Sequence, residues 1–455
     1  MKAERENFGG RIAVIMALAG SAIGLGNIWR FPYMVGEHGG AAFILLYVLA
    51  SVFVSIPIFI AETVIGRRSA ANCRGAMEKL APGSAWKWLG YLSVITPLII
   101  VSYYSVVGGW AVDYLWKGVN LRFLHMSPGD TGTIFNTLIT SVRTPLICLG
   151  VFLAISFGIV ALGVKSGIEK FSKLCLPVLF ILIVMIAIYS IRLPGAGAGI
   201  EYLLKPDLSK LTPKSFAYAL GQSFYSLSLG MGIIITYSSY VSKKENIFVS
   251  SAGTALADLF FAILAGFAIM PAVFSAGIEP GAGAGLIFDT LPYIFSSMAV
   301  EMPVLSSIAA ILLFLTILIA ALTSSVSLIE VGVAYLIEEK KMKRGWACVV
   351  LFLCVGAFAV ICSLSMGPLS GVKIFDKNIF DFTDMFSSNI LLALGGFLCV
   401  VFVGWKMKKE DVWDEFTNSG TKKRNKAIFG TVYFLIKYLA PVAVAVIFAT
   451  NFLLD

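Results

Sequence analysis

The sequence predicts an all-α polytopic membrane protein. Of its 455 residues, 58% are hydrophobic and only 13% are charged, which leaves too little polar surface to cover a water-soluble fold of this size. The apolar residues form runs of about 20, the length with which a helix crosses a hydrocarbon core about 30 Å thick. Segments such as 147–162 are apolar on every face, whereas the strands of a membrane β-barrel alternate apolar and polar residues. Helical spans are therefore expected.

Eleven apolar segments separated by short polar joints are expected to form the spans. They lie at about 11–33, 41–65, 89–116, 145–163, 171–191, 214–240, 249–276, 303–337, 346–366, 382–405 and 427–451. We divide the chain into two halves of five spans, 1–191 and 192–405, followed by a loop and one extra span in 406–455.

The basic residues predict how the spans are oriented. With the N-terminus in the cytoplasm, 24 of the 35 Lys and Arg residues fall on the cytoplasmic side and 10 on the other, in agreement with the positive-inside rule. An odd number of spans then places Asp455 outside. Topology explains the net charge of +9, and the sequence carries no RNA- or DNA-binding signature, so we expect no nucleic-acid partner.

Cysteine and histidine give no sign of a disulfide framework or a zinc site. The seven cysteines are odd in number, lie mostly in apolar runs and form no CxxC pair, and the chain has only two histidines. The first apolar segment contains Asn27, Trp29 and Arg30, which makes it too polar for a cleaved secretory signal. We treat it as a mature first span.

Spans one and six differ from the others because Gly, Ser and amide residues interrupt them near the middle. The first contains the stretch 19–27 with Asn27, and the sixth contains the stretch 221–232 with Gln222. Helix propensity is low there, and an unwound stretch is allowed in a membrane only where it lines a polar cavity. Gly-interrupted segments at corresponding positions of two halves point to the binding site of a secondary transporter. The alternative is that the glycines only let helices pack closely.

Unwound helices would expose carbonyl oxygens, which suit a hard cation such as Na⁺ together with a zwitterion. The side chains of Asn27, Ser226, Thr323 and Ser324 can add further oxygen ligands. The alternative for each hydroxyl is a bond to its own backbone one turn earlier in the helix.

Three acidic residues lie inside apolar runs, where ionisable groups are costly and usually functional. Asp258 is expected at a cation site, or else it is a protonated structural acid. Glu62 is expected to accept hydrogen bonds from the unwound part of span one or six, or else to lie at the interface. Glu330 has no partner that the sequence identifies.

Two further groups are candidates for closing and lining a cavity. Arg30, just beyond the first break, can pair with Asp381 or Asp384 at the start of span ten, unless these charges simply lie near lipid headgroups. Tyr103 and Tyr104 place phenolic donors in an apolar run, where they bind a carboxylate or pack in the core.

The stretch Gly20–Asn27, followed by Ile-Trp-Arg-Phe-Pro at 28–32, resembles the first-span signature of the neurotransmitter:sodium symporters, the family with the leucine-transporter fold. The resemblance extends over nearly the whole chain through Tyr103-Tyr104, the stretch 163–177, Tyr237–Tyr240 and Leu322–Ser325. It implies a 5+5 inverted repeat with spans one and six broken. It is closest to bacterial members with eleven spans, which implies a multi-pass protein of the bacterial inner membrane.

The resemblance also implies two sodium sites. The first would use the Ala22 carbonyl, Asn27, Ser226, Asp258 and the carboxylate of the substrate. The second would use the carbonyls of Gly20, Ile23 and Ala320 with the hydroxyls of Thr323 and Ser324.

An amino-acid site and two gates follow from the same resemblance. The substrate residues would be Ser21, Ala22, Leu25, Gly26, Ile100, Tyr104, Tyr225, Ser226, Ser228, Met231, Ser324 and Leu328. The outer gate would be Arg30 with Asp384, under an aromatic lid of Tyr104 and Tyr225. The inner gate would be Arg5, Ser239, Tyr240 and Glu338.

Four residues depart from the family pattern. Asp258 stands where many members have Asn, which adds a negative charge beside the ion and predicts transport without chloride. Tyr225 replaces a common Phe in the lid, and Phe8 replaces the usual Trp near Arg5. Met231 replaces a Phe of the leucine-preferring archetype, and an unbranched thioether repacks easily. We therefore expect large hydrophobic or aromatic L-amino acids as substrates.

Gly167 and Pro177 have the spacing that in the family lets the cytoplasmic part of span five unwind. Pro removes a backbone hydrogen bond and Gly weakens the preceding turn, so we expect water to reach the second sodium site this way; the alternative is a static kink. The sequence thus favours a sodium:amino-acid symporter over a non-transporting amino-acid sensor. It shows no catalytic constellation, so an intramembrane enzyme is not expected.

Overall fold

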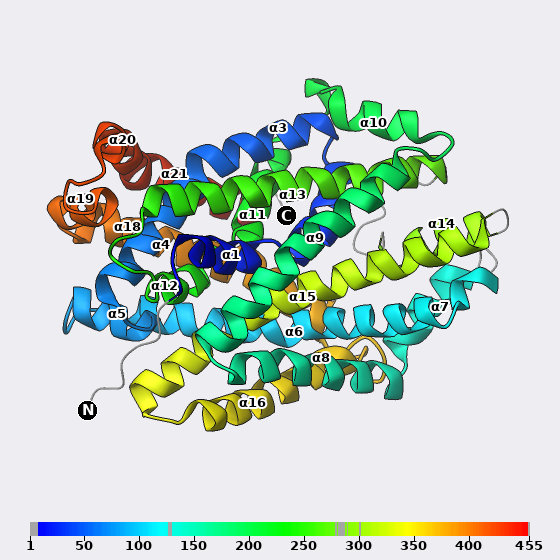
Figure 1. Ribbon diagram of the computed structural model, residues 1–455, viewed down its shortest axis with the longest axis horizontal. Helices are drawn as coiled ribbons and strands as arrows, with labels where there is room; N and C mark the ends of the chain where they lie inside the picture. The colour runs from blue at the N-terminus through cyan, green and yellow to red at the C-terminus, as the bar shows by residue number, and fades with distance from the viewer. Residues whose placement is uncertain are drawn as a thin grey trace.

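The computed structural model describes residues 8–125, 130–277, 280, 287–288, 290–299 and 302–453, and almost all of this part is helical (Figure 1). The one β element is a short antiparallel hairpin of β1 (Lys373–Ile374) and β2 (Lys377–Asn378). The predicted all-α class is confirmed.

Within the described residues, nine helices are long and apolar enough to cross a membrane. They are Ala41–Ser69 (α3 to α4), Lys87–Val119 (α6), Arg143–Ala161 (α8), Val164–Ser190 (η4 and α9), Ile247–Ser275 (α13), Pro303–Lys340 (α15), Arg344–Leu364 (α16), Ile379–Lys406 (α17 to η8) and Lys423–Val446 (α20 to α21). Each begins and ends within a few residues of the predicted segment, except that the fifth begins earlier, at Val164.

The first and sixth spans are broken, as predicted. In the first, α1 (Arg11–Ala22) is followed after three residues by η1 (Gly26–Arg30) and α2 (Phe31–Glu37), with a bend of 49°. In the sixth, α11 (Pro213–Ser226) and α12 (Ile233–Ser238) are separated by six non-helical residues, so neither part is long enough to count as a span alone. Counting both broken spans with the nine continuous helices gives eleven.

The break in span six depends on left-handed backbone conformations. Ser228, Gly230 and Gly232 have φ angles of 55°, 77° and 74°, which glycine adopts without steric cost. At Gly230 a Cβ atom would lie 2.0 Å from the Leu392 carbonyl oxygen. Glycine is therefore required here both for the turn and for the close approach of span ten.

Short helices connect the spans at the two ends of the bundle (Figure 1). At one end lie α5 (Cys73–Leu80) and α19 (Lys409–Thr417); at the opposite end lie α7 (Asp130–Thr140), α10 (Ala196–Leu204) and α14 (Thr290–Ala299). The long helices α6 and α15 run side by side along the bundle, and α1 packs against both α15 and α13. This arrangement encloses the breaks.

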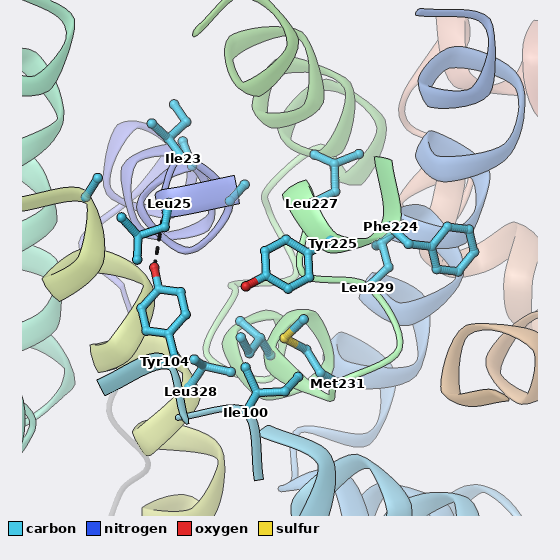
Figure 2. Packing of buried hydrophobic residues seen from close by; sticks show 14 of the residues in the cluster. Ile23, Leu25, Ile100, Tyr104, Phe224, Tyr225, Leu227, Leu229, Met231 and Leu328 are labelled. Atoms are coloured by element: carbon cyan, nitrogen blue, oxygen red, sulfur yellow. Dashed lines mark hydrogen bonds between the residues drawn. The ribbon is translucent and has the colours of Figure 1, made fainter. Parts of the chain in front are cut away.

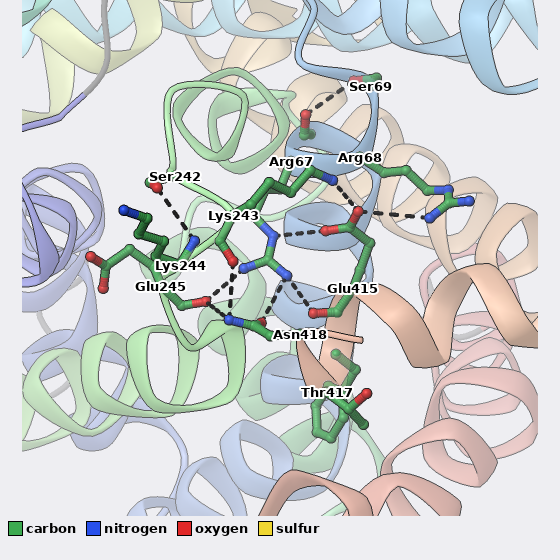
Figure 3. A network of polar contacts seen from close by, with 12 residues as sticks. Arg67, Arg68, Ser69, Ser242, Lys243, Lys244, Glu245, Glu415, Thr417 and Asn418 are labelled. Atoms are coloured by element: carbon green, nitrogen blue, oxygen red, sulfur yellow. Dashed lines mark hydrogen bonds and ion pairs between the residues drawn. The ribbon is translucent and has the colours of Figure 1, made fainter. Parts of the chain in front are cut away.

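Arg67 at the end of α4 holds α19 against the bundle (Figure 3). It is 2% exposed, and its Nε donates to Glu415 Oε2 over 2.7 Å while Nη1 donates to the Glu245 carbonyl over 2.7 Å. Lys243 also pairs with Glu415, and Asn418 donates to the Glu245 carbonyl over 2.9 Å. Three segments distant in sequence are thus fixed by one buried guanidinium.

Arg67→Gln is expected to destabilise the protein by about 3 kcal/mol, because it removes the buried cation paired with Glu415 and the donor of the Glu245 carbonyl. The neighbouring Arg68→Gln is the matched control. Arg68 is 27% exposed, pairs with Asp411 and lies 3.7 Å from Glu415 Oε1, and half-exposed pairs contribute at most about 1 kcal/mol. Thermal unfolding of both variants in detergent measures the difference, and equal Tm values would contradict this role for Arg67.

Candidate ion and substrate site

The two breaks meet and hold each other in place. Ser228 Oγ donates to the Ser21 carbonyl over 2.8 Å, and Gln222 Nε2 donates to the Gly26 carbonyl over 2.8 Å. Glu62, fully buried on α4, accepts a hydrogen bond from the Gly230 N–H over 2.7 Å. The position of Glu62 thus matches its expected role as a support for an unwound segment.

A narrow cavity lies between the breaks, α6 and α15 (Figure 2). Its lining residues are Ser21, Ala22, Gly24, Gly26, Ile100, Tyr104, Tyr225, Ser228, Met231, Ile233, Ser324 and Leu328. All predicted substrate residues are in this set except Leu25 and Ser226, and Gly24 and Ile233 are additions that the sequence reasoning missed. One end of the cavity is polar, and Ile100, Met231 and Leu328 form an apolar end (Figure 2).

The polar end is formed by free backbone and one phenol. The Leu25 N–H donates to Tyr104 Oη over 3.4 Å, so both groups lie at the polar end of the cavity. A Cβ atom at Gly24 would lie 2.1 Å from Ser324 Oγ and 3.4 Å from Tyr104 Oη. The backbone of the first break therefore lies directly against Ser324 of α15, and a side chain at position 24 requires Ser324 to move.

Asp258 on α13 is surrounded by neutral donors. It is 1% exposed, and its carboxylate accepts hydrogen bonds from Asn27 Nδ2 at 2.7 Å, Ser226 Oγ at 2.8 and 2.9 Å and Tyr47 Oη at 3.4 Å. In the described part of the chain, no Lys or Arg pairs with it. A buried carboxylate without a cationic partner is costly, so its charge fits a cation supplied from outside the protein.

Three of the predicted ligands of the first sodium site, Asn27, Ser226 and Asp258, therefore lie together, and Ala22 lines the central cavity. Asn27 turns its amide nitrogen to Asp258 and its oxygen to the Gly24 N–H, over 3.1 Å. Tyr47 is a further neighbour that the sequence reasoning missed, because a tyrosine in an apolar run carries no signal of its own.

The predicted second sodium site lies where α1 meets α15. Thr323 Oγ1 is 3.4 Å from the Ile23 carbonyl oxygen and 3.0 Å from the Ala320 carbonyl oxygen. Gly20 lies one turn earlier on α1 and faces Ser172 of α9, since a Cβ there would be 3.0 Å from Ser172 Oγ. Ser324 instead lies beside Gly24 and lines the central cavity.

On the outer side, Arg30 lies over the ring of Tyr225, with its guanidinium carbon 4.7 Å from the ring centroid. Asp384 accepts a hydrogen bond from Ser388 over 3.1 Å, and in the described residues no ion pair joins it to Arg30. Beyond these residues opens a cavity of about 620 Å³, lined among others by Trp29, Asp381 and Asp384. Tyr225 thus lines the central cavity, and Arg30 packs on its ring.

On the inner side, the acid that meets Tyr240 is Glu330. Tyr240 Oη donates to Glu330 Oε1 over 2.9 Å, and Arg344 pairs with the same carboxylate. The sequence identifies no partner for Glu330; in the structure this residue of α15 meets Arg344 of α16 and Tyr240 at the end of span six.

The other inner-gate residues are placed separately. Glu338 accepts two hydrogen bonds from Asn72 at 2.8 and 3.0 Å, and Ser239 Oγ donates to the Thr236 carbonyl over 2.5 Å. Phe8 packs edge-on against Tyr237 and Tyr240 with ring centroids 5.8 and 5.9 Å apart. Arg5 lies outside the described residues.

The start of span five is wound in this structure. Gly163, with φ 97°, precedes the helical turn η4 (Val164–Glu169), which continues into α9 (Lys170–Ser190) and contains Pro177 in its interior. A Cβ atom at Gly167 would lie 2.1 Å from the Ile159 carbonyl oxygen. Gly167 therefore has a packing reason as well as the expected role in unwinding.

A bundle of apolar helices, two of them broken around a buried cavity with a carboxylate buried beside the breaks, defines the class of secondary membrane transporters. Comparison with known proteins then identifies the family. The chain matches the Sodium:neurotransmitter symporter family over residues 5–131 and 122–454, and it belongs to this family. It is therefore a multi-pass membrane transporter of a sodium-dependent family.

Individual relatives agree. The chain is 37% identical over 441 residues to the sodium-dependent transporter YhdH of Bacillus subtilis, covering 96% of both chains. It is 27% identical over 416 residues to the sodium-dependent serotonin transporter of Drosophila melanogaster, covering 81% of this chain and 65% of that one. The crystal structure of MhsT in complex with L-phenylalanine matches with a TM-score of 0.90 and 39% identity, over 98% of this chain and 100% of that one. This similarity confirms the predicted fold.

Proposed function

We propose that the protein is a chloride-independent, sodium-coupled symporter of hydrophobic or aromatic L-amino acids. It works by alternating access in a bacterial inner membrane, with its N-terminus in the cytoplasm and its C-terminus outside. The observation that carries the proposal is the Asp258 carboxylate, buried beside the broken spans with neutral donors only. A bound Na⁺ supplies the missing positive charge.

In the first sodium site, Ala22, Asn27, Ser226 and Asp258 contribute oxygen atoms. The Asn27 amide turns over to do so, because its oxygen now accepts the Gly24 N–H. The negative charge of Asp258 balances the charge of the bound sodium, as a chloride ion does near the first sodium site of animal relatives, so transport needs no chloride. The substrate carboxylate completes the ion's ligands, which couples the affinities of ion and substrate by direct contact.

The substrate carboxylate binds Tyr104 and the N–H groups of Leu25 and Gly26 at the polar end of the cavity. These groups already converge: Leu25 N and Tyr104 Oη are 3.4 Å apart. The amine binds the carbonyls of Ala22 and Tyr225 and the residue Ser226, since free carbonyls at helix breaks attract a cation.

The second sodium site, formed by Gly20, Ile23, Ala320, Thr323 and Ser324, ties the first span to α15. When the start of α9 unwinds, water reaches this ion from the cytoplasm and loosens it. The N-terminal segment then separates from Tyr240 and Glu330 to open the inner side.

The apolar end of the cavity sets the preference for large side chains. Ile100, Met231 and Leu328 line it, and the cavity volume is about 30 Å³, so a substrate enters only as Tyr225 and Met231 move apart. Met231 has three rotatable bonds and no branches, which makes this movement easy. The similar structure of MhsT holds L-phenylalanine, which supports the proposed substrate class.

Met231→Phe is expected to reduce the affinity for tryptophan relative to leucine by about 10-fold, because a rigid ring fills the space that the thioether vacates. Competition against sodium-dependent binding of labelled leucine measures the ratio, and leucine itself serves as the internal control. An unchanged ratio would place Met231 outside the substrate pocket.

Counterflow in proteoliposomes tests the function as a whole. Preloaded leucine, tyrosine or tryptophan is expected to drive uptake of the labelled amino acid only when Na⁺ is present, at the same rate in chloride and in gluconate. Sodium-dependent binding without counterflow would instead identify an amino-acid sensor. Uptake of glycine or GABA with no response to the three large amino acids would refute the substrate class.

A further inference from the structure

The last span contacts span ten through a closely fitted junction at Gly404 and Lys437. A Cβ atom at Gly404 would lie 3.0 Å from the Lys437 Cα atom. Trp405 Nε1 donates to the Lys437 carbonyl over 3.1 Å, and Tyr433 Oη donates to the Gly404 carbonyl over 3.2 Å. Both helices form a π-helical turn at this junction, η8 (Phe402–Lys406) and η9 (Leu435–Leu439). Such turns are frequent at functional sites, and here they hold Lys437 in a fixed position.

The contact with Trp405 also fixes the depth of Lys437 in the membrane. Trp405 is 61% exposed and immediately precedes the cytoplasmic basic residues Lys406, Lys408 and Lys409. Tryptophan followed by basic residues marks the inner membrane interface. Lys437 therefore lies at this interface, although the sequence places it ten residues inside the apolar segment that we predicted from residue 427.

Two ammonium groups gather around one aromatic ring at this junction. Lys437 Nζ lies 5.0 Å from the ring centroid of Trp405, 5.7 Å from that of Tyr438 and 6.0 Å from that of Tyr433. Lys409 Nζ lies 5.7 Å from the centroid of the same Tyr433 ring.

Carboxylates do not neutralise these lysines. In the described part of the chain, neither has an ion pair within 4.0 Å. On α19, the acidic residues of the first turn are Glu410, which is exposed, and Asp411, which pairs with Arg68. Two cations that contact the same tyrosine ring and have no ion-paired carboxylate attract an anion.

An apolar stripe rises from the lysines along the last span. Tyr438, Val442 and Val446 follow each other at intervals of four residues, which places them on one face of the helix, and all three lie on the membrane side of Lys437. They are 47%, 62% and 42% exposed. The anion that suits this surface therefore carries apolar chains, which distinguishes a lipid from free phosphate.

We propose that the junction of η8 and η9 binds an anionic phospholipid of the inner leaflet. Its phosphate lies between Lys409 and Lys437, its glycerol lies at the level of Trp405 and Tyr438, and an acyl chain follows the stripe at Val442 and Val446. Basic pockets between transmembrane helices on the cytoplasmic side recognise such headgroups. The occupant stabilises the attachment of the last span to span ten.

Native mass spectrometry of the full-length protein in detergent tests the proposal with dioleoylphosphatidylglycerol and dioleoylphosphatidylcholine as probes. The wild type is expected to retain the anionic lipid more tightly than the zwitterionic one. Each lysine near an anionic headgroup contributes about fivefold in affinity, so Lys409→Gln with Lys437→Gln is expected to lower anionic-lipid affinity by about 25-fold and to leave phosphatidylcholine binding unchanged.

The matched control is Lys340→Gln with Lys423→Gln, which removes the same charge from two exposed cytoplasmic positions away from the junction. It is expected to bind the anionic lipid like the wild type. Lys409→Gln alone is expected to lower the affinity for the anionic lipid by about fivefold. Because Lys409 is exposed, this single variant keeps the test valid if the double variant is unstable. The proposal is overturned if the control loses as much as the double variant, if both lipids bind equally to the wild type, or if inorganic phosphate displaces the anionic lipid.

Discussion

Asp258→Asn is expected to weaken sodium binding by about 100-fold while the protein remains folded. Asn keeps the shape of the side chain and an oxygen ligand but removes the charge. At an effective dielectric constant of about 20, two unit charges 4 Å apart attract by about 4 kcal/mol. Part of this lost attraction is offset, because the buried carboxylate carries a desolvation cost that the neutral amide does not. The measurement is sodium-dependent binding of labelled leucine over a range of sodium concentrations.

Tyr47→Phe is the matched control for Asp258→Asn. Tyr47 contacts the same carboxylate, but only through one hydrogen bond of 3.4 Å, so its removal is expected to change sodium affinity by no more than about threefold. An Asp258→Asn variant with the sodium affinity of the wild type would show that the carboxylate is not a ligand. In that case Asp258 would be a protonated structural acid that donates and accepts within the cluster of Asn27 and Ser226.

The sequence predicts a site residue when its type is rare in its local sequence context. Asp258 and Glu62 are unusual because each is a carboxylate in an apolar run, and the breaks in spans one and six are visible as Gly and Ser where helix formers are expected. Tyr47 is not unusual in such a run, and nothing in its own segment indicates that it meets a carboxylate 211 positions away.

Contacts between distant helices are the part that sequence reasoning could not supply. Glu330 meets Tyr240, 90 positions earlier, and Arg344, 14 positions later, and only the packing of three helices brings these groups together. The depth of Lys437 is a second example. Hydropathy places it well inside a span, whereas its contact with Trp405 places it at the interface, because the last helix begins well before it reaches the membrane.

Gly24→Ala is expected to reduce the affinity for both sodium and amino acid by about 10- to 100-fold, because overpacking of a closely fitted site costs about 1 to 3 kcal/mol. The added methyl group would lie 2.1 Å from Ser324 Oγ and 3.2 Å from Ser324 Cβ. Rotation of the hydroxyl relieves only the first contact, so the first break and α15 must also move apart. That movement separates Thr323 from the Ile23 carbonyl and the Leu25 N–H from Tyr104, and each of these pairs is already at 3.4 Å.

The effect is expected to be local to the site. Gly150→Ala, in the interior of α8, is the control, since a Cβ atom there meets nothing within 4 Å and Ala is the better helix former. It should bind sodium and leucine like the wild type. Gly24→Ala should elute as a monodisperse protein with a Tm similar to that of the wild type. Its affinities for sodium and for the amino acid should fall together, because the displaced first break carries ligands for both. If Gly24→Ala lost amino-acid affinity but kept sodium affinity, the first break would belong to the substrate site alone, and the direct coupling of ion and substrate through that segment would be wrong.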